Sequence, residues 1–465
     1  MSATTASVHS RFSGLLGAAS LLAESSKFAD YEIGGMKPAV VVRPESVEQI
    51  PEIIKLAAAE KLAVITTGGR SKLNLGLPPE RYDLALDMSA LNKIISYDPG
   101  DLTLSVEAGI PLLHLAKALG QHGQFLPFAV PFTARTTIGG IIASGVDGPL
   151  RQFYGTARDY LLGMEFVTGD GIASKSGGRV VKNVTGYDIH KLMIGALGSL
   201  GVITRLNFKT FPLPVSTRGL VARFVSAAQA CAMRDRIAKS PLTPITLEVL
   251  SPRVGELFAG PVAPSPFEPA PMPAGVLSNS EWTVTTGYCG NEKVLARYAA
   301  DLRQIAEECG TTGVMILAEN LGPAWARKRE FIPIALASSP ATTIVKISVL
   351  PARMENALDA AQAAADANSL PWAALARGVG IIYFALLPEA QNEHAGARVL
   401  KTTRAIHEAV AKLEGSSTIP WCPAEWKPNL QIWGLDPQNV SQMQKLKNVF
   451  DPQRILSPGR FVGGL

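Results

Sequence analysis

The first third of the chain alternates short apolar runs with one stretch of helical periodicity. Residues 39–44 (AVVVRP) and 62–67 (LAVITT) are apolar runs of the length that buried strands have. Between them, from Ile50 to Ala57, apolar residues recur at the spacing of one helix face. Together these segments predict a β-α-β unit of about 30 residues.

After this unit the pattern predicts further strands and helices, with glycines gathered between residues 137 and 163. A Pro-Gly turn at 98–101 separates two strand-like runs, and a helix is expected to end at Gly120. Strands are expected at 84–88, 102–107 and 202–211, and helices at 111–120 and 188–200.

Two closely spaced prolines, Pro212 and Pro214, mark the edge of this first unit. Beyond residue 216 short strands alternate with helices, and we find no internal repeat. The stretch 259–275 holds too many prolines for a helix or a sheet and is expected to be a surface loop. In this second unit strands are expected at 220–225, 245–250, 281–290, 343–350 and 379–388, and helices at 227–238, 293–308, 352–367 and 404–413.

Charge and cysteine usage narrow the class of protein. The net charge is only +5, from 44 basic and 39 acidic residues, and no basic stripe marks a nucleic-acid binder. No stretch of 18 apolar residues occurs, and no basic segment precedes the short apolar run near the N-terminus. We therefore expect a cytoplasmic protein that reaches a membrane only through partners. The four cysteines form no C-x-x-C pair, which excludes a local zinc knuckle and a ferredoxin-type cluster: Cys231, Cys289, Cys309 and Cys422.

The loop that follows the second apolar strand, 67–72 (TGGRSK), is the first candidate site. Adjacent glycines let several backbone N–H groups point into one concavity, which suits phosphate oxygens. A strand and two prolines follow this loop, so it opens no helix of the Rossmann type and matches no Walker motif. Taken alone, the loop is equally consistent with an ordinary tight turn.

Two further glycine-rich segments, 131–145 and 195–204, make a binding function more favourable than an ordinary turn. Small residues allow a backbone to approach a flat ring or a diphosphate closely. Each segment alone is also compatible with close-packed buried turns. Three such segments within one unit favour a large, extended dinucleotide.

The order of these motifs is similar to that of a known domain. GGRSK with Leu75-Gly76, VEAGIPL (106–112), TTIGG (136–140), YGTARDYLLG (154–163) and the segment 182–204 resemble the FAD-binding domain of the vanillyl-alcohol-oxidase and p-cresol-methylhydroxylase (PCMH) type. FDPQRILSPGRF (450–461) resembles the end of the lactate and glycolate oxidoreductases of that superfamily. Within them, the chain most resembles the FAD-binding subunits of bacterial glycolate oxidases.

This resemblance implies an α+β fold in several parts. A two-lobed PCMH-type FAD-binding domain is expected at 38–215, after an N-terminal extension at 1–37. A substrate or cap domain with an antiparallel sheet is expected at 216–440. The C-terminal segment, 441–465, is expected to return to the flavin site.

The resemblance also implies where FAD binds. The loop 67–72 is expected to cradle the diphosphate, and Gly201 and Ile203 to meet the adenine through their backbone. The loops 64–76 and 129–160 contain no His or Cys, so FAD is expected to be non-covalent. The complete set of expected cofactor-binding residues is Thr67, Gly68, Gly69, Arg70, Ser71, Lys72, Gly76, Pro131, Phe132, Thr137, Gly139, Gly140, Ser144, Gly145, Gly201 and Ile203.

The catalytic residues are not evident from the sequence. A hydroxy-acid oxidase needs a base for the hydroxyl proton and a cation for the carboxylate. His190 is a candidate base, and Arg377, Arg327 and Arg329 are candidate carboxylate clamps, although a structural role is the simpler interpretation for each. The glycolate oxidases that this chain resembles also have a larger FAD subunit, which carries a metal site with histidine. At the corresponding position this chain has RGVG (377–380), so no metal is implied.

These considerations leave three functional hypotheses. The first is a FAD-binding subunit of a glycolate oxidase-like complex. It would oxidise a small 2-hydroxy acid (glycolate or D-lactate) beside a paralogous FAD subunit and pass electrons to an iron–sulfur subunit. The second is a non-catalytic electron-relay or structural FAD subunit. The third is a free-standing FAD-dependent alcohol or hydroxy-acid oxidase. Flavin reduction by substrate in the isolated chain distinguishes them.

Overall fold

The computed structural model describes residues 3–17, 20–22, 25–179, 186–259, 276–317, 327–434 and 439–465. The proline-rich stretch predicted at 259–275 lies outside these residues, apart from its first member, Ala259, which ends helix α8 (Arg253–Ala259). Helices and antiparallel sheets are mixed along the chain, which confirms the expected α+β class.

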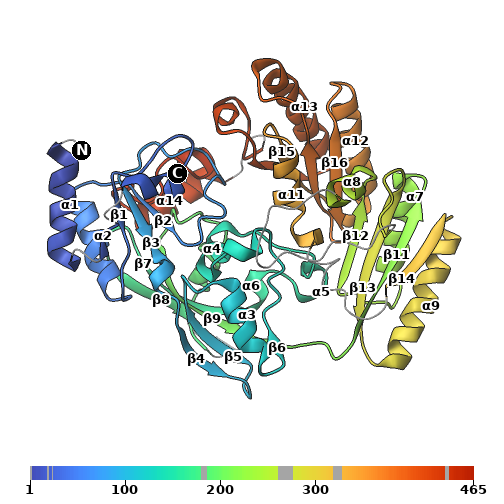
Figure 1. Ribbon diagram of the computed structural model, residues 1–465, viewed down its shortest axis with the longest axis horizontal. Coiled ribbons are helices and arrows are strands. Elements are labelled where there is room, and N and C mark those ends of the chain that lie inside the picture. The colour runs from blue at the N-terminus through green and yellow to red at the C-terminus, as the bar shows by residue number, and fades with distance from the viewer. Residues whose placement is uncertain are drawn as a thin grey trace.

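The N-terminal lobe contains the predicted β-α-β unit. Its strands β1 (Val40–Val42), β2 (Val64–Thr67) and β3 (Leu84–Asp87) form a parallel sheet in the order β1-β3-β2. Helix α2 (Gln49–Ala59) joins β1 to β2 and buries its apolar face. Helix α1 (Ala3–Leu16) lies at the outer edge of this lobe (Figure 1).

A five-stranded antiparallel sheet follows, in the order β4-β5-β9-β7-β8. Strand β4 lies just before the predicted turn at 98–101, and the sequence did not predict it, because none of its residues is fully buried. Helices α3 (Leu112–Gly120) and α4 (Ile138–Ser144) pack on this sheet. The strands are β4 (Ile94–Asp98), β5 (Thr103–Glu107), β7 (Leu161–Val167), β8 (Ala173–Gly177) and β9 (Val202–Lys209).

The prediction of a helix at 188–200 is wrong. Only a 3-10 turn at Ile189–Leu192 is helical. Gly195, Leu197 and Gly198 have φ angles of 80°, 52° and 73°, which a right-handed helix does not contain. Met193 and Ala196 are buried although this segment is a loop, so their burial does not come from a helix face.

The second half of the chain forms an eight-stranded sheet in the order β14-β11-β13-β12-β16-β17-β15-β18, in which all pairs are antiparallel. Strand β10 (Phe211–Pro212), which pairs with β6 (Gln124–Phe125), precedes it. The eight strands are β11 (Thr217–Phe224), β12 (Thr246–Leu250), β13 (Trp282–Cys289), β14 (Gly313–Leu317), β15 (Thr343–Ser348), β16 (Trp372–Arg377), β17 (Ile381–Leu386) and β18 (Ser416–Trp421).

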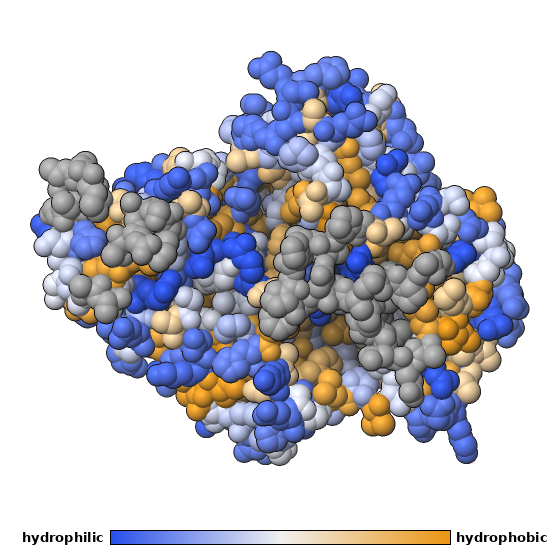
Figure 2. Space-filling model, viewed as in Figure 1, coloured by the Kyte–Doolittle hydropathy of each residue, from blue (hydrophilic) through white to orange (hydrophobic). Residues whose placement is uncertain are grey.

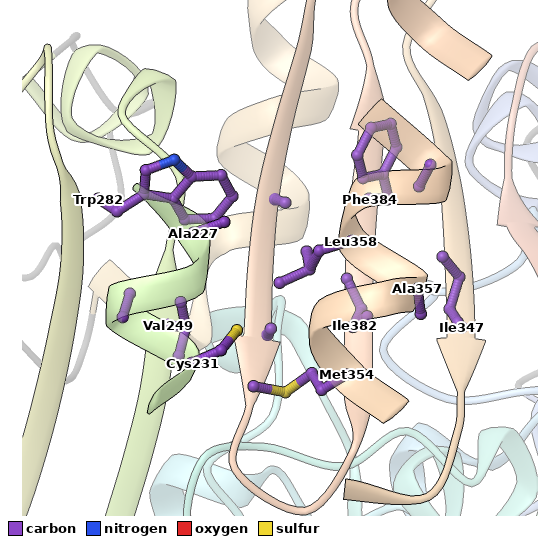
Figure 3. Close-up of a cluster of buried hydrophobic side chains, with 14 of the residues drawn as sticks. Ala227, Cys231, Val249, Trp282, Ile347, Met354, Ala357, Leu358, Ile382 and Phe384 are labelled. Carbon is purple, nitrogen blue, oxygen red and sulfur yellow. The ribbon is translucent and has the colours of Figure 1, made fainter. Parts of the chain in front are cut away.

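Four long helices cover one face of this sheet (Figure 1). Cys231 and Met354 point from two of these helices into a core that includes Val249, Ile382 and Phe384 of the strands (Figure 3). Helix α13 is twice as long as the helix predicted at 404–413. The helices are α7 (Ala227–Ala238), α9 (Glu292–Glu308), α12 (Met354–Asp366) and α13 (Glu393–Lys412).

The opposite face of the eight-stranded sheet packs against α8, α11 (Phe331–Ser338) and residues of the first half of the chain. Leu75 and Phe132 belong to this cluster, together with Tyr383 and Trp421 of the sheet. This face therefore carries the contact between the two halves.

The chain ends beside its beginning. After α14 (Val440–Phe450) the backbone adds a short parallel bridge to β2, where Val64 N–H donates to Ile455 O at 2.7 Å and Ser457 N–H donates to Val64 O at 2.9 Å. Figure 1 shows the C-terminus next to the three-stranded sheet. The C-terminal segment thus becomes part of the N-terminal lobe.

Hydrophilic residues cover most of the face that Figure 2 shows, and hydrophobic residues lie among them in small groups. No helix in the described part of the chain is both long enough and apolar enough to span a bilayer.

Candidate active site

Three cavities follow one another through the first half of the chain and into its contact with the eight-stranded sheet. We call them the inner cavity, the loop cavity and the chamber. Thr67 and Thr137 line both the inner and the loop cavity, and Ser144 lines both the loop cavity and the chamber. Leu197 lines all three, so the cavities form one elongated channel.

The inner cavity is walled by backbone and small side chains. Gly139 and Gly140 of α4 face Gly198 and Gly201 of the segment that crosses the interior. Gly139 is required by packing, because a Cβ there would lie 2.8 Å from the carbonyl oxygen of Ala108. Such a slot suits a flat ring held by backbone contacts.

The loop cavity is formed by the loop 67–72 where it packs on residues 135–137. A Cβ on Gly69 would lie 1.5 Å from the carbonyl oxygen of Arg135, so only glycine fits there. The hydroxyl of Thr67 is buried and has no hydrogen-bond partner among the described residues. A buried hydroxyl without a partner indicates a missing ligand atom at this position.

Lys72 places a cation in the loop cavity. Its Nζ donates to Thr136 Oγ1 at 2.7 Å and to Ser71 Oγ at 3.1 Å. Burial lowers the pKa of Lys72 to about 7, and the carboxylate of Glu330 acts in the opposite direction. An anion in the cavity would restore the charge that burial disfavours.

Arg70 lines the same cavity, and its side chain is held from behind. Its Nη1 donates to Tyr31 Oη at 3.2 Å and lies 3.4 Å from Asp87 Oδ2, and its guanidinium stacks over the Tyr31 ring. Asp87 is buried, and it also accepts hydrogen bonds from Arg43. Arg70 is therefore already partly neutralised by Asp87.

The carbonyl groups that follow the loop are held by two buried cations from the second half of the chain. Arg460 donates to the carbonyl oxygens of Leu73 and Leu75, and Lys427 donates to those of Asn74 and Gly76. Burial lowers the pKa of Arg460 to about 10 and that of Lys427 to about 8. These contacts fix the position of the loop relative to the chamber.

The chamber lies between Ser144 to Val146 and the eight-stranded sheet. Lys346 of β15 and Tyr383 of β17 are opposite each other across the strand pair, and both line the chamber. Lys346 Nζ forms no hydrogen bond or ion pair with the described residues. Trp421, Trp433 and aliphatic residues form much of the remaining wall, to which Ser144 and Thr418 add two hydroxyl groups.

Asp147 lies behind Tyr383 and lines a neighbouring cavity, not the chamber itself. Its carboxylate forms ion pairs with Arg377 and Arg151, and Tyr383 Oη lies 3.5 Å from its Oδ1. Burial opposes ionisation of Asp147, but the charges of Arg377, Lys346 and Arg151 outweigh it and hold the pKa of Asp147 below its ordinary value.

The structure brings together most of the residues that the sequence indicated for the cofactor. Pro131 and Phe132 are the exceptions. They line no part of the channel, because Pro131 is buried and the Phe132 ring packs against Trp421 at 6.1 Å. The residues that line the channel are Thr67, Gly68, Gly69, Arg70, Ser71, Lys72, Gly76, Thr137, Gly139, Gly140, Ser144, Gly145, Gly201 and Ile203.

None of the catalytic candidates from the sequence lines the channel. His190 is buried against β8, where its Nδ1 lies 3.0 Å from Ser176 Oγ, and burial lowers its pKa. Arg377 is neutralised by Asp147, and Arg327 donates to the carbonyl oxygen of Phe258. Arg329 lies 3.5 Å from the carboxylate of Glu330.

Sequence reasoning missed Lys346, Tyr383 and Asp147. They come from three elements far apart in the chain, and only the tertiary fold brings them together. A signal was present for one of them, because Lys346 is the one charged residue in the strand TIVKIS, whose other residues are mostly buried.

Comparisons with known proteins agree with this geometry. A model of the FAD binding domain matches residues 38–176, and a model of the C-terminal domain of FAD linked oxidases matches residues 213–419 and 433–461. The fold resembles that of p-cresol methylhydroxylase, with a TM-score of 0.77 at 17% identity over 99% of this chain and 97% of the other. At that identity the similarity shows a shared fold.

Two curated relatives are subunits of one kind of enzyme. Glycolate oxidase subunit GlcD of Bacillus subtilis is 25% identical over 431 residues, which cover 91% of this chain and 88% of that protein. Glycolate oxidase subunit GlcE of Escherichia coli is 36% identical over 200 residues, which cover 43% of this chain and 55% of that protein. With both family models matched in order along the chain, this protein belongs to the FAD-linked oxidases and its cofactor is FAD.

Proposed function

We propose that this chain is a FAD-dependent oxidoreductase acting on the CH–OH group of a small 2-hydroxy acid, glycolate or D-lactate. The observation that carries the proposal is the ammonium of Lys346, which forms no ion pair with the described residues and lines the chamber opposite Tyr383. A hydroxy acid offers a carboxylate for the cation and a hydroxyl for the phenol. The relation to glycolate oxidase subunits supports the same substrate class.

FAD fits the channel without a covalent link. Residues 67–72 and Thr137 would hold the diphosphate, because the unpartnered Thr67 hydroxyl and the buried Lys72 lie there. Gly198, Gly201 and Ile203 would meet the adenine end. No residue that lines these cavities in the described part of the chain is His or Cys. When bound, FAD supplies a two-electron acceptor for the substrate α-hydrogen.

The chain's own residues orient the substrate. Lys346 binds the carboxylate, since its ammonium lines the chamber and forms no ion pair with a carboxylate of the described residues. The oxygen of Tyr383 can accept a hydrogen bond from the substrate hydroxyl and orient it in the chamber. Trp421 and Trp433 give the chamber an apolar wall beside these contacts.

We also propose that the chain works in the cytoplasm as a subunit of a complex. The similarity to both GlcD and GlcE supports a paralogous FAD subunit as a partner. An iron–sulfur subunit would then receive the electrons. Division of the chain into a FAD-binding domain at 38–215 and a cap domain at 216–440 fits this proposal, with 441–465 returning to the flavin site. Binding to a membrane would be indirect.

Replacement of Lys346 tests the substrate assignment. We expect Lys346→Met to lower kcat/KM for glycolate or D-lactate roughly 10- to 100-fold, the loss of one charge-assisted hydrogen bond, mainly through KM. Flavin content should stay unchanged, and Lys412→Met, at the exposed end of α13, should behave as wild type. Equal kinetics in the two variants would refute the role of Lys346.

A further inference from the structure

Glu330 of the second half holds a turn of the first half by its backbone. Its carboxylate accepts hydrogen bonds from the backbone N–H groups of Phe132, at 2.7 Å, and of Thr133, at 3.1 Å. Phe132 has a φ angle of 60°, in the left-handed region that bulky residues rarely adopt. A left-handed residue followed by a helical one turns successive N–H groups toward one point, where an anion can bind. Here the anion is the protein's own carboxylate.

Helix α11 fixes the position of Glu330. The residue directly precedes this helix, whose Phe331 and Ile334 are buried in the cluster between the eight-stranded sheet and the first half. The Glu330 side chain is only 12% exposed, and Arg329 Nε lies 3.5 Å from the carboxylate oxygen that Thr133 contacts. Arg329 therefore shares the charge of the carboxylate, while the shorter contacts are those to the turn.

The same turn supports the loop that would cradle the diphosphate. Thr136 Oγ1 donates to Phe132 O at 2.8 Å and accepts a hydrogen bond from Lys72 Nζ at 2.7 Å. The backbone of the turn also packs directly against Gly69 of the loop. Lys72 and Gly69 line the loop cavity, whereas the carboxylate itself lines none of the three cavities. Its influence on the cavity therefore passes through the turn.

We propose that Glu330 is a positioning residue for FAD. Through it the second half of the chain holds the turn 132–136, and with the turn Lys72, in place for the diphosphate. This role accounts for Phe132, which the sequence indicated for FAD but which lines no part of the channel, because its backbone N–H serves the carboxylate. The inference rests on the proposed place of the diphosphate in the loop cavity.

The charge of Glu330 also acts on Lys72, where it raises the pKa of the lysine against the effect of burial. The other charged groups at or behind the loop cavity are Arg70, Arg460, Asp87 and Arg329. A neutral side chain of equal length at position 330 should lower the pKa of Lys72 further. A shorter carboxylate keeps the charge but cannot reach both N–H groups. The reach and the charge of this side chain can thus be tested separately.

Fluorescence titration of the apoprotein with FAD tests both properties. Glu330→Asp should raise the Kd for FAD roughly tenfold at pH 6, where Lys72 is charged, which is the effect of losing one charge-assisted hydrogen bond. Glu330→Gln should move the pH above which the Kd rises to a lower value, because Lys72 then loses its proton more readily. Glu389→Gln, which removes an exposed carboxylate, serves as the control and should match wild type in both measurements.

A Kd in Glu330→Asp equal to that of wild type would overturn the proposal. So would an unmoved pH dependence in Glu330→Gln, because a residue that only stabilises the fold would lower the thermal midpoint and leave the pH dependence where it is. The thermal midpoint of each apoprotein is recorded for this comparison.

No substrate enters these titrations, so the two proposals can fail separately. If the FAD affinities change as expected but no hydroxy acid reduces the flavin, the proposed oxidation fails while the role of Glu330 stands.

Discussion

At the scale of single residues, the site contains buried basic side chains, and burial disfavours their charged form. Lys72 is the clearest case, because its neighbours in the loop cavity are hydroxyl groups and the more distant carboxylate of Glu330. Burial lowers its pKa to about 7. The diphosphate of FAD would favour the protonated form and raise this pKa.

FAD affinity should therefore depend on pH. Below about pH 7 Lys72 is already protonated and FAD binding takes up no proton. Above this pH binding must protonate Lys72, so the Kd for FAD should rise as pH rises, by up to about tenfold per pH unit. Fluorescence titration of the apoprotein between pH 6 and 9 measures this slope.

The matched variant is Lys72→Met. It should bind FAD more weakly at pH 6 than wild type and show little change up to pH 9. A Kd of wild type that stays constant over the same range would show that Lys72 does not face the diphosphate.

At the scale of elements, the C-terminal segment stabilises the channel from outside. Lys447 of α14 is buried, and its Nζ donates to Ser199 O at 2.8 Å, Asp451 Oδ2 at 2.7 Å and Leu456 O at 2.7 Å. Ser199 belongs to the segment whose Gly198 and Gly201 line the inner cavity. One side chain thus connects α14, the C-terminal bridge to β2 and the channel wall.

Lys447→Met should destabilise the protein by about 3–5 kcal/mol, because it leaves Asp451 buried without its cation. We expect a lower thermal midpoint and weaker retention of FAD. Lys445→Met, on the exposed side of the same helix, serves as the control and should change neither. If both variants have the same thermal midpoint as wild type, the contacts of Lys447 do not stabilise the fold.

How far the sequence predicted these elements depended on how each one buries its side chains. The β-α-β unit and the glycine loops were predicted, because periodicity and glycine spacing are local. Strand β4 was missed because it is not fully buried, and 188–200 was mistaken for a helix because positive φ angles at Leu197 and its neighbours are not visible in an apolar run. Lys346 and Asp147 meet only after the two halves dock.

At the scale of the whole molecule, the chamber exists only where the two halves meet. Ser144 and Gly145 come from the first half, and Lys346 and Tyr383 from the inner face of the eight-stranded sheet. Arg460, from the end of the chain, lines the loop cavity. The cofactor channel therefore lies mainly in one half, and the proposed substrate-binding cation lies in the other. Substrate and cofactor would meet where the two halves join.

The most direct test of this account is the visible spectrum of the purified chain with its FAD, recorded without oxygen before and after addition of glycolate or D-lactate. We predict that the flavin bands bleach and that Lys346→Met slows the bleaching. Bands that persist with every 2-hydroxy acid in the isolated chain, and also after its partner subunits are added, would contradict the proposed oxidation.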